Sequence, residues 1–213
     1  MSKQGKLLFK YGTMSSGKSL HLIATAHNFQ EHSIPFLIIK SEIDTRDGSG
    51  VVHSRALGDM ECVTISLEDN IYSIICDYLD SSIYTGYEQP KWLLVDEAQF
   101  LTSSQVEQLS AIADNLGISV ICYGLRTDFK TKLFEGSKRL FELADSFEEI
   151  KSSCYCNHKT IFNARINKNK EIVTDGAQIE VGGDDRYTSV CRKCYFKAIS
   201  HPLYRNNNDN NLD

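Results

Sequence analysis

Eight consecutive residues near the start of the chain have the types and spacing that phosphate binding requires. They follow the apolar residues Leu7-Leu8-Phe9 and match the pattern GxxxxGK[S/T]. Glycines allow the backbone to curl until successive N–H groups face a phosphate, and the N-terminus of a following helix adds a partial positive charge. Lys18 would approach the β and γ oxygens of a nucleotide, and the Ser19 hydroxyl would bind Mg²⁺. The predicted phosphate contacts are Gly12, Thr13, Met14, Ser15, Ser16, Gly17, Lys18 and Ser19.

Two acidic residues stand directly after a strand-length apolar run. Trp92-Leu93-Leu94-Val95 is continuously apolar, as expected of a strand buried on both faces, and Asp96-Glu97 follow at its carboxyl end. Open α/β sheets bind ligands at that end of their strands. We expect Asp96 to hold Mg²⁺ and Glu97 to be the catalytic base that accepts a proton from an attacking hydroxyl. Glu97 could instead only cap the next helix or face solvent, but its pairing with the phosphate-binding run favours the catalytic interpretation.

Four cysteines have the spacing of a metal site. Cys154 and Cys156 form a CxC, Cys191 and Cys194 form a CxxC, and 34 residues separate the two pairs. Four thiolates suit tetrahedral Zn²⁺, and with no open position the metal would be structural. Only one residue separates the two cysteines of the CxC, which restricts how both can bind one metal ion, so His158 is an alternative ligand. The other interpretation is that the four cysteines are ordinary reduced thiols. The remaining cysteines lie in apolar stretches and are expected to be core residues: Cys62, Cys76 and Cys122.

Alternating strand-like and helix-like segments predict the sheet that positions these groups. Strands are expected at 6–11, 35–40, 61–65, 91–95 and 118–123. Helices are expected at 18–30, 67–79 and 106–115. Ser66 with Asp69, and Thr102 with Gln105, have the spacing of capping boxes, and Gly117 would end the third helix. The predicted fold class is therefore α/β, a P-loop NTPase-like, mainly parallel sheet flanked by helices, with a small second domain.

The chain divides by composition into three parts. Residues 1–150 are expected to form an ATP-binding α/β domain, and residues 151–197 a small zinc-binding domain. The polar stretch 198–213 ends in NNNDNNLD and is expected to be disordered. Residues 41–60 are polar, contain glycines and are too long for an idle connection, so they are expected to be a functional lid or a mobile segment.

The composition limits the remaining functions. The chain has 213 residues, a net charge of -5 and a pI near 5.7, which give no general attraction to nucleic acid or to an anionic membrane. Its apolar stretches are of strand length, and a mean hydropathy of -0.29 argues against an integral membrane protein. The first residues leave no room for a signal peptide before the first strand, so we expect a cytoplasmic protein with reduced cysteines.

The sequence Asp96-Glu97-Ala98-Gln99 also matches the DEAQ form of a helicase box. The alternative function is therefore a nucleic-acid-stimulated ATPase with a zinc ribbon. Such motors close two α/β domains around ATP, and the residues beyond 150 are expected to supply neither a second sheet nor a basic strand-binding surface. The length of the chain argues against this alternative.

Four blocks, in order, resemble the cytosolic-type (type II) thymidine kinases: GTMSSGKS, VDEAQF, YGLRTDFKTKLFEGS and GGDDRYTSVCRKCYF. The similarity spans about residues 6–197. It implies an ATP-binding α/β domain and a small zinc-binding lasso domain, whose loop covers the nucleoside. It also implies transfer of the γ-phosphoryl group of ATP to the 5′-hydroxyl of thymidine or deoxyuridine in nucleotide salvage. A cytoplasmic homotetramer under feedback inhibition by dTTP is the state that the resemblance implies.

The resemblance also implies roles for individual residues. Glu97 corresponds to the base that deprotonates the 5′-hydroxyl, and Lys18 and Ser19 correspond to the phosphate and magnesium contacts. Asp44 and Arg46 align with residues near the phosphates. The residues that align with the nucleoside pocket are Met14, Phe100, Leu125, Phe129, Phe134, Gly182 and Tyr187. Independently, Phe100, Phe129 and Phe134 could form an aromatic slot in which a pyrimidine stacks.

Overall fold

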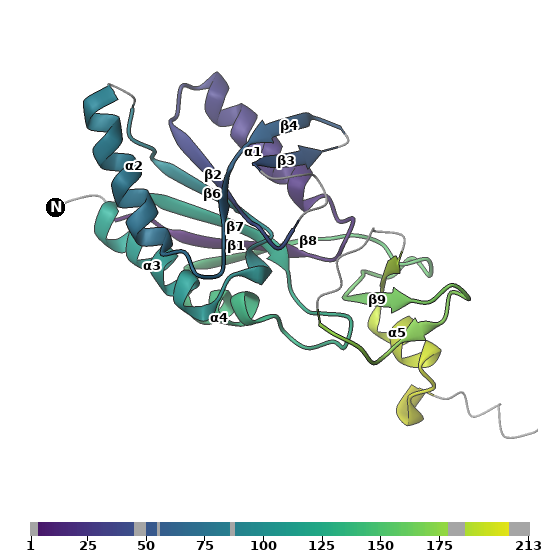
Figure 1. The fold of residues 1–213 in the computed structure, drawn as a ribbon. Helices are drawn as coiled ribbons and strands as arrows, with labels where there is room; N and C mark the ends of the chain where they lie inside the picture. Colours follow the sequence, from purple (N-terminus) through teal and green to yellow (C-terminus); the bar gives the residue numbers. More distant parts are fainter. Residues whose placement is uncertain (1–3, 45–49, 55, 86–87, 179–185, 205–213) are drawn as a thin grey trace, which may run out of the picture.

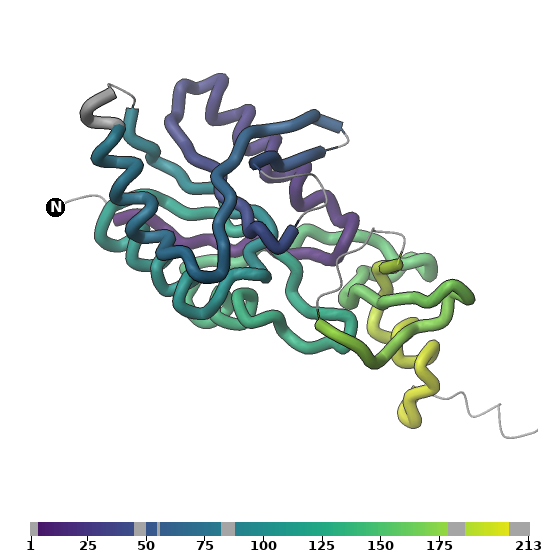
Figure 2. The backbone as a smooth tube through the Cα atoms, in the orientation of Figure 1, coloured from purple at the N-terminus to yellow at the C-terminus, as the bar shows by residue number. Residues whose placement is uncertain are grey.

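The computed structural model describes residues 4–44, 50–54, 56–85, 88–178 and 186–204 (Figure 1). Arg46 and Gly182, two of the predicted site residues, lie outside the described residues. A six-stranded sheet forms the centre of the molecule, and a three-stranded sheet lies beside one end of it (Figure 2).

The central sheet is entirely parallel. Its strands lie in the order β5-β2-β6-β7-β1-β8. They are β1 (Leu7–Gly12), β2 (Phe36–Ser41), β5 (Val63–Ile65), β6 (Trp92–Asp96), β7 (Ser119–Leu125) and β8 (Ser146–Ile150). The five predicted strands are confirmed, with β5 shorter than expected. The sequence does not predict β8, because this edge strand exposes Ser146, Phe147 and Glu148 and has no apolar run.

Successive side chains of a strand point to opposite faces of the sheet, so neighbouring residues of the central strands pack in two different hydrophobic clusters. Leu93 and Val95 of β6 pack in one hydrophobic cluster, and Leu94 between them packs in another. The helices that complete these clusters are α1 (Lys18–Glu31), α2 (Ile71–Thr85), α3 (Ser103–Leu116) and α4 (Glu135–Leu143). Figure 1 shows α1 on one face of the sheet and the other three on the opposite face, which confirms the predicted fold class. None of the described helices is both long and apolar enough to cross a bilayer.

Both ends of α3 are set by the predicted residues. The Thr102 hydroxyl accepts a hydrogen bond from the Gln105 N–H at 3.1 Å, and the Gln105 side chain accepts one from the Thr102 N–H at 3.1 Å. Gly117 follows the helix with φ 68°, a left-handed conformation that costs glycine little. The capping box and the terminating glycine are therefore confirmed.

The predicted start of α2 is wrong, because the helix begins at Ile71, four residues later than expected. Asn70 precedes it, and its side-chain oxygen accepts a hydrogen bond of 2.9 Å from a backbone N–H of the first turn. The side chain of Gln105 in α3 donates to the carbonyl oxygens of Ser66 and Asp69 at 2.7 and 3.1 Å. These bonds hold the preceding segment as a turn, so a side chain distant in sequence decides the boundary.

Part of the predicted lid at 41–60 is an ordered hairpin. β3 (Val51–Ser54) pairs antiparallel with β4 (Gly58–Glu61). Val52 and Met60 are buried in the same cluster as the apolar side chains of α1. This part of the segment is therefore fixed to the core of the central sheet.

The three-stranded sheet is antiparallel, in the order β10-β9-β11, and is called the small sheet below. Its elements are β9 (Phe162–Ile166), β10 (Ile172–Val173) and β11 (Tyr187–Val190), followed by α5 (Arg192–Ala198). Phe162, Ala164, Val190 and Tyr195 belong to a hydrophobic cluster separate from the two of the central sheet. The small sheet therefore has a core of its own.

The prediction of a disordered tail at 198–213 is wrong for its first part. A short 3-10 helix, η3 (Pro202–Tyr204), stacks Tyr204 on Phe196 with ring centroids 4.9 Å apart. His201 also packs against Phe196, at 5.0 Å between centroids. These ring contacts order the chain as far as Tyr204.

Candidate active site

The glycine-rich run forms a tight loop between β1 and α1. β1 ends at Gly12 and α1 begins at Lys18, so the loop lies at the carboxyl end of the sheet. Ser15 and Gly17 have positive φ angles of 57° and 90°, which turn the backbone within a few residues. Lys18 is buried, and its Nζ donates to the Thr13 carbonyl oxygen at 3.0 Å. The predicted phosphate contacts of residues 12–19 therefore form one loop, with the lysine folded across it.

The predicted magnesium ligands meet beside this loop. Asp96 ends β6, and the Ser19 hydroxyl donates to its Oδ2 at 3.4 Å. Burial and the neighbouring Glu97 carboxylate raise the pKa of Asp96 to about 7, while Lys18 and Lys40 act in the opposite direction. A divalent cation between the hydroxyl and the carboxylate would favour the charged form of Asp96. The donor set and its charge therefore fit a Mg²⁺ site.

Glu97 has an unusual backbone conformation and a fixed side-chain partner. Its φ is 51°, in the left-handed region that residues with a Cβ seldom adopt, and the short helix η1 (Ala98–Phe100) begins directly after it. The side-chain amide of Gln99 donates a short hydrogen bond to the Glu97 carboxylate, and the amide oxygen accepts from the Leu125 N–H at 2.9 Å. A Cβ at Gly124 would lie 2.9 Å from that oxygen, so glycine leaves room for it. The Glu97 carboxylate is thus tied through one amide to the end of β7.

A buried ion pair lies near the acidic residues. Lys40 Nζ is 2.9 Å from Asp44 Oδ2, and the two side chains are only 2% and 4% exposed. The same ammonium donates to the Val51 carbonyl oxygen at 3.3 Å, and Lys40 lies opposite Asp96 in the pairing of β2 with β6. The structure thus places Asp44 against Lys40, at the end of the strand that pairs with β6. Lys40 is not among the predicted site residues, although a lysine at the carboxyl end of a predicted strand is a signal that could reveal it.

The predicted nucleoside residues form two aromatic groups. Phe100 and Phe134 meet edge to face, with ring centroids 5.8 Å apart. Phe129 is buried, and the guanidinium of Arg165 lies 3.7 Å from its ring centroid. Arg165 also donates to the Tyr187 hydroxyl at 2.8 Å. We expected a slot between the rings of Phe100, Phe129 and Phe134, but Phe129 instead faces Arg165 of the small sheet. The sequence gives no signal for this partner.

Two other predicted nucleoside residues lie at the same edge of the central sheet. Leu125 ends β7 and is opposite Gly12 in the pairing of β7 with β1. Met14 follows in the loop after β1, and its backbone contacts the small sheet. Of these two predicted nucleoside residues, Met14 therefore lies in the phosphate loop and Leu125 lies beside it.

The four predicted zinc ligands converge. The sulfur atoms of Cys154, Cys156, Cys191 and Cys194 all lie within 4.8 Å of one another. With Zn–S bonds near 2.3 Å, tetrahedral geometry separates the sulfurs by roughly 3.8 Å, so the spacing fits zinc. His158 lies beside the cluster, with Nδ1 3.4 Å from Cys156 Sγ. Within the described part of the chain the metal-ligating group consists of the four thiols, which favours the CxC over His158 as the source of ligands.

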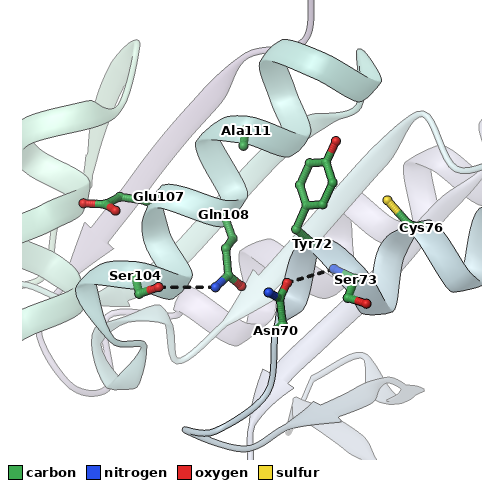
Figure 3. A pocket seen from close by; sticks show the side chains of 8 residues that line it. All are labelled: Asn70, Tyr72, Ser73, Cys76, Ser104, Glu107, Gln108 and Ala111. Atoms are coloured by element: carbon green, nitrogen blue, oxygen red, sulfur yellow. Dashed lines mark hydrogen bonds between the residues drawn. The ribbon is translucent and has the colours of Figure 1, made fainter.

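A separate groove of about 600 Å³ lies between α2 and α3 (Figure 3). Tyr72 and Cys76 line it from α2, and Glu107 and Gln108 line it from α3. The described residues around it include none of the predicted site residues. The chemistry expected from the sequence therefore lies elsewhere, at the carboxyl edge of the sheet.

The fold and the site together define a class of protein. A parallel sheet with a glycine-rich phosphate loop after β1 and an acidic pair at the end of β6 is the arrangement of P-loop nucleotide-binding proteins. The thymidine kinase family model matches residues 5–195. The chain therefore belongs to the thymidine kinase family, as its sequence blocks indicate.

Relatives are similar over most of the chain. A thymidine kinase from Pasteurella multocida (strain Pm70) is 46% identical over 92% of this chain and 98% of the relative. Thymidine kinases from Haemophilus influenzae (strain 86-028NP) and Rhodopirellula baltica are 44% and 42% identical, over 89% and 91% of this chain and 95% and 89% of the relatives. Among solved structures, the Pif1 helicase from Candida albicans aligns with 70% of this chain and 36% of its own at a TM-score of 0.42 and 17% identity. That likeness is too low to inform the fold or the function.

Proposed function

We propose that this protein transfers the γ-phosphoryl group of ATP to the 5′-hydroxyl of thymidine or deoxyuridine. Membership of the thymidine kinase family supports the choice of acceptor. The observation that supports this chemistry is that the glycine-rich loop, the hydrogen-bonded pair of Ser19 and Asp96, and the Glu97 carboxylate meet at the carboxyl ends of the strands. Positioning and charge stabilisation are what phosphoryl transfer requires of a protein.

The donor would be held by the loop and its lysine. The loop amides and Lys18 would bind the triphosphate, with the lysine exchanging the Thr13 carbonyl oxygen for phosphate oxygens. Ser19 and Asp96 would hold Mg²⁺, which neutralises charge on the phosphates when bound. Asp44, paired with Lys40, would lie beside them, and the resemblance supports Arg46 as a further phosphate contact.

Glu97 would be the catalytic base. It would accept the proton of the 5′-hydroxyl as the hydroxyl oxygen bonds to the γ-phosphorus and the bond from that phosphorus to the β–γ bridging oxygen breaks. ADP would leave with the electron pair of the broken bond. Glu97 is buried, and its link to Gln99 keeps the carboxylate in one orientation, which supports this role.

The nucleoside would lie between the end of β7 and the small sheet. Phe100 and Phe134 would supply an apolar aromatic wall, and Tyr187 would close the opposite side. Phe129, which faces Arg165, would support that side. The remaining pocket residues on this proposal are Met14, Leu125 and Gly182.

The metal and the domain division are also proposals. Four thiolates would hold a structural Zn²⁺ and tie the loop at 154–156 to the start of α5. The separate hydrophobic cluster of the small sheet supports a division into residues 1–150 and 151–197. By resemblance to the family, we further propose a cytoplasmic homotetramer that dTTP inhibits.

The alternative, a nucleic-acid-stimulated ATPase with a zinc ribbon, is not favoured. The thymidine kinase family model covers the phosphate loop, the DEAQ sequence and the cysteines together. The expectation that residues beyond 150 form no second sheet is wrong, because the small sheet lies there. The small sheet is antiparallel, however, so among the described residues the DEAQ motif has no second parallel sheet opposite its own.

An acceptor screen tests the proposal. Purified protein is incubated with ATP, Mg²⁺ and one of thymidine, deoxyuridine, deoxycytidine, deoxyguanosine or single-stranded DNA, and the products are separated by chromatography. We expect thymidine and deoxyuridine 5′-monophosphates to form. Turnover stimulated by DNA without a nucleoside product would support the ATPase instead.

A further inference from the structure

Two side chains of the small sheet form hydrogen bonds with the backbone of the phosphate loop. The Met14 N–H donates to Asn163 Oδ1 at 2.7 Å, and the Ser189 hydroxyl donates to the Met14 carbonyl oxygen at 2.7 Å. Both polar groups of one loop residue are therefore bound by side chains about 150 or more positions later in the sequence. These bonds leave the side chain of Met14 uninvolved.

Asn163 and Ser189, which bind the phosphate loop, lie on the same face of the small sheet as Arg165 and Tyr187. In the antiparallel pairing of β9 with β11, Asn163 is opposite Ser189 and Arg165 is opposite Tyr187. Residues two apart on a strand point to the same face, so these four side chains form one surface. One pair contacts the phosphate loop, and the other carries the guanidinium that lies on Phe129.

Asn163 is fixed in the orientation that this contact needs. It is buried, and its Nδ2 donates to the Thr127 carbonyl oxygen at 3.3 Å, so that Oδ1 is left to accept from the loop. A second contact supports the first: the Thr13 hydroxyl lies 2.9 Å from Ser152 Oγ and 3.0 Å from Thr160 Oγ1. Side chains of the small sheet and of the segment before β9 therefore contact two successive loop residues, Met14 and Thr13.

We propose that Asn163 and Ser189 are positioning residues of the phosphate loop, through which the small sheet sets the affinity for the donor triphosphate. This inference rests on the proposed function of the loop. The left-handed turn at Ser15 directly follows Met14, so a fixed Met14 fixes where the turn begins. A loop that is already ordered loses less conformational entropy when a ligand binds.

Three variants of β11 test the proposal. Ser189→Ala removes the hydroxyl that binds Met14, Ser189→Thr retains a hydroxyl, and Thr188→Ala removes a hydroxyl from the opposite face of the same strand. Affinity for a non-hydrolysable ATP analogue with Mg²⁺ is measured by titration calorimetry, and affinity for thymidine is measured separately. We expect Ser189→Ala to weaken analogue binding by about two- to tenfold, the range for one hydrogen bond, and to weaken thymidine binding less. Ser189→Thr and Thr188→Ala should bind the analogue within about twofold of the unaltered protein.

Asn163→Ala provides a second test, with a larger expected loss because it leaves the part-buried Met14 N–H without its acceptor. Zinc content and the melting temperature of each variant are measured alongside. Unchanged analogue affinity in both Ser189→Ala and Asn163→Ala would overturn the inference. So would loss of zinc in both, because it would assign them to the stability of the small sheet. If the unaltered protein does not bind the analogue, the proposed function itself fails, which is a different outcome.

Discussion

At the scale of single residues, the neutral side chain of Gln99 determines the orientation of the Glu97 carboxylate, the predicted catalytic base. Gln99 is buried and joins the Glu97 carboxylate to the Leu125 N–H. The amide cannot turn over without exchanging its donor and acceptor ends, which would break both bonds. The position of Gln99 therefore makes the orientation of Glu97 depend on the end of β7.

Replacing Gln99 by Leu should lower kcat by about tenfold or more and change the KM for ATP little. The substitution removes the donor to the Glu97 carboxylate, and a hydrogen bond to a charged group is worth about 1.5–3 kcal/mol. Steady-state kinetics with each substrate varied in turn would measure the split between kcat and KM. Gln30→Leu, at an exposed position of α1, is the matched control. An unchanged kcat in folded Gln99→Leu protein would show that the link does not position the base.

Asp96→Asn should stabilise the metal-free, nucleotide-free protein at pH 8 and lose most of that advantage at pH 5. The pKa of about 7 in the folded protein lies above the value of about 4 in an unfolded chain, so folding becomes less favourable as the pH rises between the two. Asparagine is never charged and escapes this cost. A gain of about 1 kcal/mol would raise the Tm by about 2–4 °C at this chain length. Thermal melts in Mg²⁺-free buffer at both pH values measure the difference, and an equal gain at pH 5 and pH 8 would contradict the assigned cause.

The sequence predicts site residues that form a recognisable motif with their neighbours in the chain. It misses residues whose partners are distant in sequence and meet them only in the folded protein. The loop at 12–19 and the pair Asp96-Glu97 are recognisable because glycine, lysine and carboxylates at those spacings serve phosphate chemistry. Lys40 and Arg165 are ordinary basic residues until the fold places them against Asp44 and Phe129. The place of Lys40 at the end of a predicted strand could have singled that residue out, but neither contact is visible in a single sequence.

At the scale of elements, local signals predict a boundary well when the boundary is decided locally. Thr102 and Gln105 bond to each other across one turn, and α3 begins where they indicate. The start of α2 depends instead on Gln105, which lies in α3 and bonds to carbonyl oxygens before α2. Strand β8 is missed for a related reason, since its pairing with β1 is what orders an exposed polar segment.

Thr102→Ala should reduce the unfolding free energy by about 1 kcal/mol, the usual effect of losing a helix N-cap. The substitution removes the hydroxyl that accepts from the Gln105 N–H. Urea denaturation followed by circular dichroism measures the change. Ser103→Ala is the control, because its side chain lies one position beyond the cap. Equal effects of the two substitutions would mean that the capping bond contributes nothing measurable.

At the scale of the whole molecule, a cluster of four cysteines links the two ends of the segment that contains the small sheet. The cysteine cluster joins residues 154–156, before β9, to the first turn of α5, after β11. The small sheet has few strands and a small core, so metal binding should contribute a large part of its stability.

Removal of the metal should therefore loosen the small sheet before the central sheet. Purified protein should contain one zinc per chain, measured by plasma mass spectrometry. After mild chelation, hydrogen exchange should accelerate in β9 and β11 while β1 and β6 stay protected. Metal-depleted protein with unchanged exchange in β9 and β11 would show that the cluster does not hold the small sheet together.

The central claim is that ATP and thymidine bind next to each other at the carboxyl ends of the central strands, and that Glu97 removes the proton of the thymidine 5′-hydroxyl. The most direct test compares the amounts of ADP and thymidine 5′-monophosphate formed from ATP, Mg²⁺ and thymidine. The protein should form one monophosphate per ADP and little ADP without thymidine. Glu97→Gln should slow both products by about 10²–10⁴-fold, the contribution of a positioned base, while binding ATP as before. ADP released at the same rate with and without thymidine, or a Glu97→Gln protein of full activity, would contradict the claim.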